Sequence, residues 1–240
     1  MPRSLVIIPT YNEIENIEKM LETVMNLERP FDVLIVDDGS PDGTADKVRE
    51  KMAKYDGRIH LEERTGKLGL GTAYIHGFKW ALARDYEYIF EMDCDFSHNP
   101  ADLPRLEDAC IGGAGLSVGS RYVTGVNVVN WPMSRVLLSY FASVYVRFIT
   151  GMPIQDATAG FKCYKRSTLE AINFNKIQFV GYAFQIEMKF TAWRKGIEVA
   201  EVPVIFTDRT EGESKMSSGI IKEAIFGVIK LKIRSLFSKA

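Results

Sequence analysis

Strand and helix patterns alternate regularly through the first half of this 240-residue chain. Short apolar runs are typical of buried strands, and the segments between them carry apolar residues at helical spacing. The predicted strands are residues 5–9, 31–36, 59–62, 88–92 and 116–120, and the predicted helices are residues 12–25, 44–55, 69–84 and 102–109. This alternation predicts an α/β fold with a mostly parallel central sheet and helices on both faces.

The second half of the chain is less regular. The pattern predicts an irregular segment at 155–164, a helix at 183–195 and a strand at 200–206. A polar loop, expected to be mobile, follows at 207–219. A last helix is predicted over about residues 220–238. Five basic residues against one acid, Glu223, accompany this helix: Lys222, Lys230, Lys232, Arg234 and Lys239.

A strongly apolar helix is predicted between Pro132 and Gly151. The only polar stripe along it, at i, i+4 spacing, consists of Arg135, Ser139, Ser143 and Arg147. Such a helix is expected either to be deeply packed or to lie on a lipid surface. Its longest apolar stretch, at 136–149, spans about 20 Å, short of the ~30 Å core of a bilayer, so no membrane-spanning helix is predicted.

Composition argues against several classes of protein. A net charge of −1 is unlike the basic excess of general nucleic-acid binders, so no nucleic-acid partner is expected. The three cysteines, Cys94, Cys110 and Cys163, lack the spacing of a disulfide framework or a zinc site. The first predicted strand begins so early that it leaves no room for a signal peptide. A cytoplasmic protein is therefore expected.

Two aspartates, Asp93 and Asp95, directly follow the predicted strand at 88–92. In an open α/β sheet, ligands bind in the crevice beyond the carboxyl ends of the strands. Carboxylate oxygens at that edge suit Mg²⁺ or Mn²⁺, with substrate phosphates completing the coordination. A lone D-x-D also often begins a solvated loop, so a metal site is supported only if the other strand ends carry suitable groups as well.

Polar groups also follow the first two predicted strands. Residues 9–13 lack the glycine-rich turn of a dinucleotide-binding fold, which argues against NAD. Tyr11 and Glu13 offer a stacking face and an acceptor for a base, although this segment can equally serve only to start a helix. Asp38 can accept hydrogen bonds from a ribose or base, although a simple turn explains it about as well. The convergence of three strand ends predicts a nucleotide site with metal-bound phosphates.

Six segments occur in the order seen in the dolichyl-phosphate mannosyltransferases, which are inverting family-2 glycosyltransferases with the GT-A fold. These segments are PTYNE at 9–13, VDDGSPDGT at 36–44, KLGLG at 67–71, MDCDFSH at 92–98, GSRY at 119–122 and DATAGF at 156–161. The chain resembles this family over nearly its whole length. The resemblance implies a single GT-A, Rossmann-like domain over 1–240, with a nucleotide-sugar-binding half at 1–125 and an acceptor-binding half at 126–240.

The resemblance also implies roles for individual residues. The nucleoside would be held by Pro9, Tyr11, Glu13, Val36 and Asp38. The metal would be held by Asp93 and Asp95, with the Cys94 backbone near the diphosphate and Ser97, where some relatives have Gln, as a candidate third ligand. Donor phosphates would contact Arg121, Arg209 and Lys215, and the acceptor phosphate would contact Arg121 and Arg135. Asp95 and Arg121 are the candidate catalytic residues.

The implied reaction is transfer of mannose from GDP-mannose to dolichyl or another polyprenyl phosphate, with inversion and with Mg²⁺ or Mn²⁺. The acceptor phosphate is already ionised near neutral pH, so no strong protein base is expected. Asp156 occupies the position where relatives with hydroxyl acceptors have a base, and here it is expected to position the acceptor or a cation. Some members of the family continue into transmembrane helices, whereas this chain stops at Ala240. Peripheral contact with the cytoplasmic face of an anionic membrane is therefore expected, through amphipathic surface, a membrane-anchored partner or a homodimer.

Three alternatives remain at the level of sequence. The same fold could use UDP-glucose or UDP-GlcNAc, or transfer to a saccharide hydroxyl. The chain could instead be a catalytically silent lipid- or nucleotide-binding subunit of a membrane complex, but the presence of both Asp93 and Asp95 speaks against this. A sugar nucleotidyltransferase would want a glycine-rich phosphate loop after the first strand, which is missing.

Overall fold

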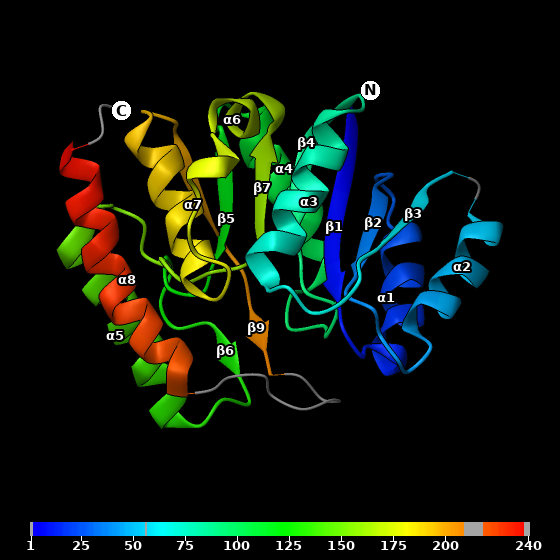
Figure 1. Cartoon of the computed structure of the whole chain (residues 1–240), viewed down its shortest axis with the longest axis horizontal. Coiled ribbons are helices and arrows are strands. Elements are labelled where there is room, and N and C mark those ends of the chain that lie inside the picture. The colour runs from blue at the N-terminus through cyan, green and yellow to red at the C-terminus, as the bar shows by residue number, and fades with distance from the viewer. Residues whose placement is uncertain (1, 56, 209–217, 238–240) are drawn as a thin grey trace.

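The computed structural model describes residues 2–55, 57–208 and 218–237, with side chains in the last segment from Phe226 onward. A seven-stranded sheet forms the centre, with strand order β3-β2-β1-β4-β7-β5-β8 (Figure 1). The strands are β1 (Arg3–Thr10), β2 (Asp32–Asp37), β3 (Ile59–Glu63), β4 (Tyr86–Glu91), β5 (Leu116–Ser120), β7 (Lys162–Lys165) and β8 (Val199–Pro203). The helices are α1 (Ile14–Met25), α2 (Thr44–Lys54), α3 (Leu70–Leu82), α4 (Leu103–Ile111), α5 (Met133–Thr150), α6 (Arg166–Ala171), α7 (Ala183–Arg194) and α8 (Ser218–Phe237).

Helices cover both faces of the sheet because successive strand residues point to opposite sides. On β1, Val6 and Ile8 are buried against α1 and α4, whereas Leu5 and Ile7 are buried against α3 and α7. All four side chains are fully buried. A strand buried on both faces reads as a continuous apolar run, which is why the sequence reveals it. The predicted α/β fold with a mostly parallel sheet is confirmed.

One strand of the sheet was missed by the sequence analysis. The segment 155–164 was predicted to be irregular, but residues 162–165 form β7, which pairs antiparallel with both β4 and β5. The strand is short and begins with Lys162, a residue type that rarely marks a buried strand. Lys162 is fully buried here because its ammonium pairs with the buried carboxylate of Glu91 at 3.0 Å. The prediction was wrong because this ion pair is invisible in the local pattern.

A second difference concerns the predicted strand at 200–206. The structure divides it into β8 and a separate short strand, β9 (Phe206–Thr207). Strand β9 pairs with β6 (Val128–Val129) in a two-stranded parallel sheet. This small sheet lies toward the lower end of Figure 1, the end at which β1 finishes. It therefore brings the segment around β9 to the carboxyl edge of the main sheet.

Helices α5 and α8 lie side by side at one end of the molecule (Figure 1). They share with α7 an apolar cluster that includes Val146, Ile186, Val228 and Leu231. The polar stripe of α5 turns inward: Ser143 is buried, and Arg147 donates to the side chain of Gln155. Much of the apolar surface of α5 therefore faces outward, which fits neither a deeply packed helix nor an ordinary surface helix. Within the residues described, no helix combines the length and apolar character needed to cross a bilayer.

Candidate active site

A pocket of about 310 Å³ lies at the carboxyl ends of β1, β2 and β4. Its lining brings together the residues predicted at three separate strand ends. Of the predicted site residues, the pocket is lined by Pro9, Tyr11, Glu13, Asp38, Asp93, Cys94, Asp95, Ser97 and Arg135. The expectation that parallel strands would gather these groups in one crevice agrees with this arrangement.

The remaining predicted site residues lie elsewhere. The side chain of Val36 is fully buried in the core between the sheet and α3, so it does not line the pocket and a nucleoside would meet only its main chain. The expected side-chain contact from Val36 is corrected accordingly. Arg121 lines a second, smaller cavity of about 50 Å³ beside the first. Arg209 and Lys215, together with most of the loop expected to be mobile, lie outside the described residues.

The end of the pocket near β1 and β2 is organised by charged hydrogen bonds. Arg64 donates from Nε to Asp38 Oδ1 at 2.7 Å and from Nη1 to the hydroxyl of Thr72. Lys67 places its ammonium 5.1 Å from the centre of the Tyr11 ring. Arg64 was not singled out from sequence, and Lys67 was noted only as the first residue of the KLGLG segment, because both follow β3 in a turn without a helical or strand pattern. Only the sheet order brings them beside β1.

The end of the pocket near β4 is formed by the D-x-D segment. Asp95 accepts a hydrogen bond from the backbone of Ser97 at 3.0 Å and is largely buried. The side chain of Asp93 is 40% exposed, and the hydroxyl of Tyr74 lies 3.4 Å from its Oδ1. Burial of the Tyr74 hydroxyl raises its pKa well above the ordinary value, and the Asp93 charge adds to this effect. Tyr74 therefore stays protonated and can only donate to this carboxylate.

The donor atoms of this segment fit a hard divalent cation. Ser97 Oγ is buried and has no hydrogen-bond partner among the described residues, so a buried oxygen is left over beside two carboxylates. Such an unpaired oxygen is costly unless a ligand satisfies it. The described residues contain no group of three or more His, Cys, Asp or Glu side chains arranged for a metal. A cation here would therefore depend on substrate phosphate oxygens to complete its coordination, as is usual for Mg²⁺.

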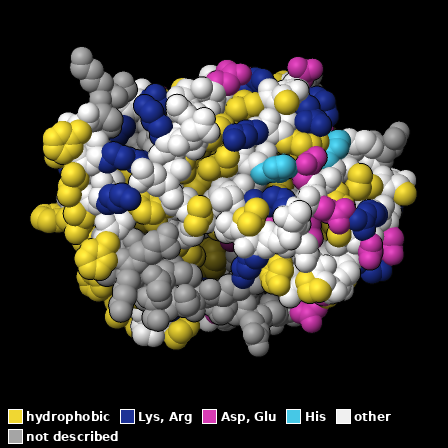
Figure 2. Space-filling model, viewed as in Figure 1, with side chains coloured by type: hydrophobic (Ala, Val, Ile, Leu, Met, Phe, Trp, Pro, Cys, Tyr) yellow, Lys and Arg dark blue, Asp and Glu magenta, His cyan; other side chains and the backbone are white. Residues whose placement is uncertain are grey.

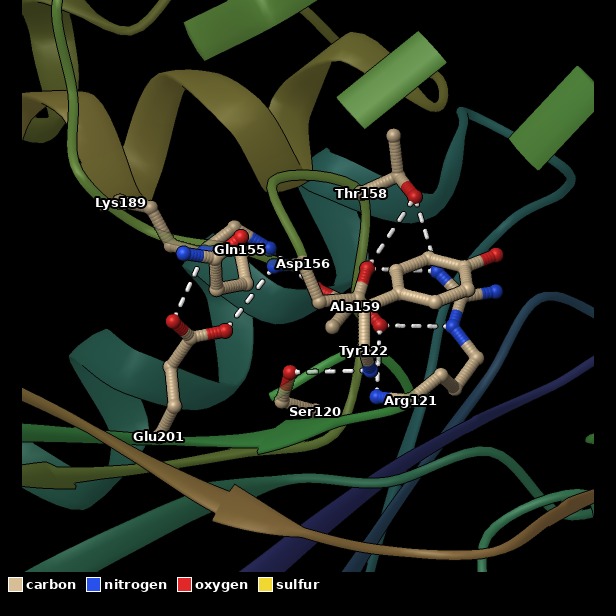
Figure 3. A network of polar contacts seen from close by, with 9 residues as sticks. All are labelled: Ser120, Arg121, Tyr122, Gln155, Asp156, Thr158, Ala159, Lys189 and Glu201. Carbon is tan, nitrogen blue, oxygen red and sulfur yellow. Dashed lines mark hydrogen bonds and ion pairs between the residues drawn. The ribbon is translucent and has the colours of Figure 1, made fainter. Parts of the chain in front are cut away.

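Arg121 is held by a buried carboxylate, Asp156 (Figure 3). Its Nε and Nη2 donate to the two carboxylate oxygens at 2.7 Å each, and its backbone amide donates to Oδ2 at 2.9 Å. Nη2 also donates to the hydroxyl of Thr158. The loop that carries Asp156 is fixed in turn by Glu201, which accepts hydrogen bonds from the backbone amides of Gln155 and Asp156. This bidentate geometry fixes the guanidinium plane.

The Arg121–Asp156 pair determines the charge state of both groups. Burial alone would raise the pKa of Asp156, but the charge and hydrogen bonds of Arg121 lower it below its usual value. Burial alone would lower the pKa of Arg121, and the carboxylate reverses this and raises it. Asp156 is therefore ionised and engaged by donors, and it is poorly suited to accept a proton as a general base. Asp156 was expected to position either the acceptor or a cation. The geometry supports positioning of a cation, the guanidinium of Arg121.

Aromatic rings surround the two arginines on this side of the pocket. The guanidinium of Arg121 lies 5.5 Å from the ring centres of both Trp131 and Phe206. The guanidinium of Arg135 lies 4.1 Å from the ring centre of Trp131 and donates to Asp208 at 2.8 Å. The positively charged side chains of Arg121 and Arg135 are thus held beside the D-x-D segment. Neither ring was recognised from sequence, because Trp131 follows β6 without a regular pattern and Phe206 was predicted only as the last residue of a strand.

Comparison with known proteins shows which family this chain belongs to. The family model described as "Glycosyl transferase family 2" matches residues 5–172. The chain belongs to glycosyl transferase family 2. This glycosyltransferase is 46% identical to "Polyprenol monophosphomannose synthase" of Mycolicibacterium smegmatis, over 99% of this chain and 90% of the relative. It is also 46% identical to "Undecaprenyl-phosphate mannosyltransferase" of Micrococcus luteus, over 95% of this chain and 93% of the relative. The resemblance to dolichyl-phosphate mannosyltransferases inferred from the motifs is confirmed.

Two further comparisons extend this result. The glycosyltransferase is 35% identical to "Dolichol-phosphate mannosyltransferase" of Pyrococcus furiosus, over 94% of this chain and 62% of that longer relative. Among solved structures, glucosyl-3-phosphoglycerate synthase from Mycobacterium tuberculosis matches with a TM-score of 0.68 and 17% identity, over 99% of this chain and 81% of the other. At that identity the similarity concerns the fold alone, and it confirms the expected GT-A-like architecture.

The buried ion pair of this family 2 enzyme gives a testable stability prediction. Asp156→Asn removes the counter-charge of a guanidinium that stays buried, so the free energy of unfolding is expected to fall by about 3–5 kcal/mol. Because the pKa of Asp156 is lowered in the folded state, its stabilising effect is present above the usual carboxyl pKa of about 4. This effect is lost only as the pH falls through the lower folded-state value. Urea unfolding of both proteins at pH 7 and at stepwise lower pH measures it.

Asp46→Asn is the matched control, because Asp46 forms an exposed ion pair with Arg49 on α2. The cost of losing such a surface pair is expected to stay below about 1 kcal/mol. Equal effects of the two substitutions at pH 7 would contradict the structural role assigned to Asp156.

Proposed function

We propose that this glycosyltransferase transfers mannose from GDP-mannose to a polyprenyl phosphate, with inversion at the anomeric carbon. The observation that carries the proposal is the 46% identity to two named polyprenyl-phosphate mannosyltransferases, each matched over 90% or more of its length. The site chemistry is compatible with it. The main pocket joins a nucleoside-sized end, a pair of carboxylates and Arg135, and the cavity beside it adds Arg121. An anionic donor and an anionic acceptor together require such positive charge.

At the donor end, Tyr11 and Asp38 supply a ring face and a carboxylate for a nucleoside. Arg64 keeps Asp38 in a fixed orientation, so the carboxylate does not have to be ordered on binding. A divalent cation, Mg²⁺ or Mn²⁺, would be held by Asp93 and Asp95 with Ser97 as a further oxygen, and it would supply positive charge to the departing diphosphate.

At the acceptor end, Arg121 and Arg135 provide positive charge for a phosphate monoester. An oxygen of the ionised acceptor phosphate forms the new bond to the anomeric carbon. The bond from that carbon to the diphosphate oxygen breaks, and GDP leaves with the electron pair. No proton has to be removed from the nucleophile, which is consistent with an Asp156 carboxylate fully engaged by Arg121. A saccharide hydroxyl as acceptor would instead need a base, and Asp156 is not free to act as one because Arg121 engages both of its oxygens.

The donor and acceptor assignments are tested together with radiolabelled nucleotide sugars and short polyprenyl phosphates. GDP-mannose with a polyprenyl phosphate is expected to give a new mannosylated lipid, at least tenfold faster than UDP-glucose or UDP-GlcNAc. Polyprenol without the phosphate serves as the control acceptor and should stay unmodified, because it is not ionised. Product with a UDP-sugar alone would reassign the donor, and no product with any donor would favour a silent binding subunit.

The proposed cation site gives a second test. Asp93→Asn and Asp95→Asn are each expected to lower kcat by more than about 100-fold, because the diphosphate loses the oxygens that hold its counter-charge. EDTA should abolish transfer by the unaltered enzyme, and added Mg²⁺ or Mn²⁺ should restore it. Asp102→Asn, on the segment after the D-x-D but outside the pocket lining, is the control. Full activity in chelator would remove the cation from the proposal.

We also propose that the enzyme docks on a membrane through α5 and α8. Exposed apolar side chains gather on these helices, at the left end of the molecule in Figure 2. The most exposed are Met133, Phe141 and Phe148 on α5 and Phe226, Leu236 and Phe237 on α8, at 60–85% exposure. A lipid acceptor would have to be met at a bilayer surface, and an apolar helix pair can insert there. The basic residues contribute less than their number suggests, because Lys232 donates to the Thr150 carbonyl and Arg234 pairs with Glu187.

Flotation with anionic liposomes tests the docking proposal. Phe141→Ser with Phe148→Ser is expected to weaken binding by about tenfold per residue, since burial of each ring contributes roughly 1.5–3 kcal/mol. Ile111→Ser is the control, because Ile111 is similarly exposed at 56% but lies at the end of α4. If liposomes do not bind the unaltered enzyme and its sedimentation shows a dimer that the double variant loses, the apolar face is a subunit interface instead.

A further inference from the structure

A small cavity of about 50 Å³ adjoins the main pocket between the D-x-D segment and Arg121. Asp93, Leu70, Tyr182 and Phe206 line both spaces, so the cavity is a side chamber of the same site. Its volume corresponds to roughly three to five water-sized groups. It can therefore take one edge of a small ligand whose remainder lies in the main pocket.

His98 presents a fixed donor to this chamber. The backbone amide of Asp93 donates to His98 Nδ1 at 3.1 Å, so Nδ1 has no proton and the neutral ring carries its proton on Nε2. The ring stacks on Phe161 at 5.0 Å between centres and meets Phe206 edge-on at 5.5 Å. The imidazole is thus buried and held in one orientation, with its Nε2–H group available for a ligand.

Gln185 presents a second donor, oriented by a buried charge. Its Oε1 accepts a hydrogen bond from Lys162, whose ammonium also pairs with Glu91. With the oxygen committed to Lys162, the amide nitrogen Nε2 remains for another partner. No acceptor for Gln185 Nε2 or His98 Nε2 is found in the part of the chain that the structure describes. Both side chains are more than nine-tenths buried and line the chamber, so these donors are held in place for a ligand group that enters it.

The two donors converge where Gly160 lacks a side chain. A Cβ atom placed on Gly160 would lie 3.6 Å from Gln185 Nε2 and 4.0 Å from His98 Nε2. Neutral N–H groups with the Asp93 carboxylate at the rim suit a hydroxyl oxygen, whereas a phosphate would meet like charge there. The chamber also lies between the residues proposed to hold the leaving diphosphate and those proposed to hold the attacking phosphate. The sugar must lie between these two groups during transfer.

We infer that His98 Nε2 and Gln185 Nε2 bind a hydroxyl group of the transferred sugar in the chamber beside Gly160. The inference rests on the proposed function for the identity of the sugar. It assigns to these side chains the recognition of the sugar, as distinct from the nucleotide. A site built from donors that have no other partner discriminates strongly against ligands that lack the matching oxygen.

Two substitutions test the inference by different means. Gln185→Glu keeps an oxygen for Lys162 but replaces the donor by an acceptor. Gly160→Ala keeps ordinary contact distances at a glycine without positive φ, yet it places a methyl group in the chamber. Each is expected to raise the Kd for GDP-mannose about tenfold, which corresponds to loss of one hydrogen bond. The Kd for GDP should change less than twofold, since GDP does not reach the chamber.

Gln178→Glu is the matched control, because it makes the same change from amide to carboxylate at an exposed residue that lines neither space. It should leave both constants unchanged. Calorimetric titration gives both constants without turnover, so this test stays separate from the test of mannosyl transfer. The inference would be overturned if both variants weakened the binding of GDP as much as that of GDP-mannose. It would also be overturned if the binding of neither ligand changed.

Monodeoxy analogues of GDP-mannose identify the hydroxyl. One analogue should bind the unaltered enzyme about tenfold more weakly than GDP-mannose does, and that penalty should disappear in Gln185→Glu. Coupling between one ligand oxygen and one side chain is not produced by a merely structural role of Gln185. If every analogue shows the same penalty in the variant as in the unaltered enzyme, no sugar hydroxyl is bound there.

Discussion

The buried contact between Asp156 and Arg121 is the interaction on which the rest of the site depends. A guanidinium held away from water is costly unless a carboxylate and further hydrogen-bond acceptors surround it. Asp156 and Thr158 provide these acceptors, and the loop that carries both leads directly into β7. The position of the Arg121 guanidinium is therefore coupled to the insertion of the antiparallel strand β7 between β4 and β5. The placement of the Arg121 guanidinium and the order of the strands therefore depend on the same segment of the chain, residues 156–165.

Much of the fold and of the pocket could be predicted from sequence because simple patterns encode them. Parallel strands buried on both faces give apolar runs, and their carboxyl ends identify Tyr11, Asp38, Asp93 and Asp95 as neighbours. The prediction failed where stability comes from pairs distant in sequence. Lys162 reads as polar surface until Glu91 is placed beside it, and β7 was missed for that reason.

The donors in the chamber escaped the sequence analysis for a related reason. Every residue of α7 from 183 to 190 is buried, so Gln185 belongs to no polar stripe that would distinguish it. His98 lies within a recognised motif, but its role depends on which ring nitrogen faces the Asp93 amide. The orientation of α5 could not be predicted either, since a polar stripe normally marks the solvent face and here marks the packed one.

The place of β7 in the sheet also bears on the order in which the chain can fold during synthesis. Strand β5 leaves the ribosome before β7, yet it joins the sheet only through β7 and β8. Strands β1 to β4 and their helices can associate as soon as they emerge, whereas β5 must wait with its edges unpaired. Long-range pairing of this kind is slow and leaves strand edges open to other chains. The part of the chain that contains β5, β7 and β8 is consequently the part of the nascent protein with the greatest need of a chaperone.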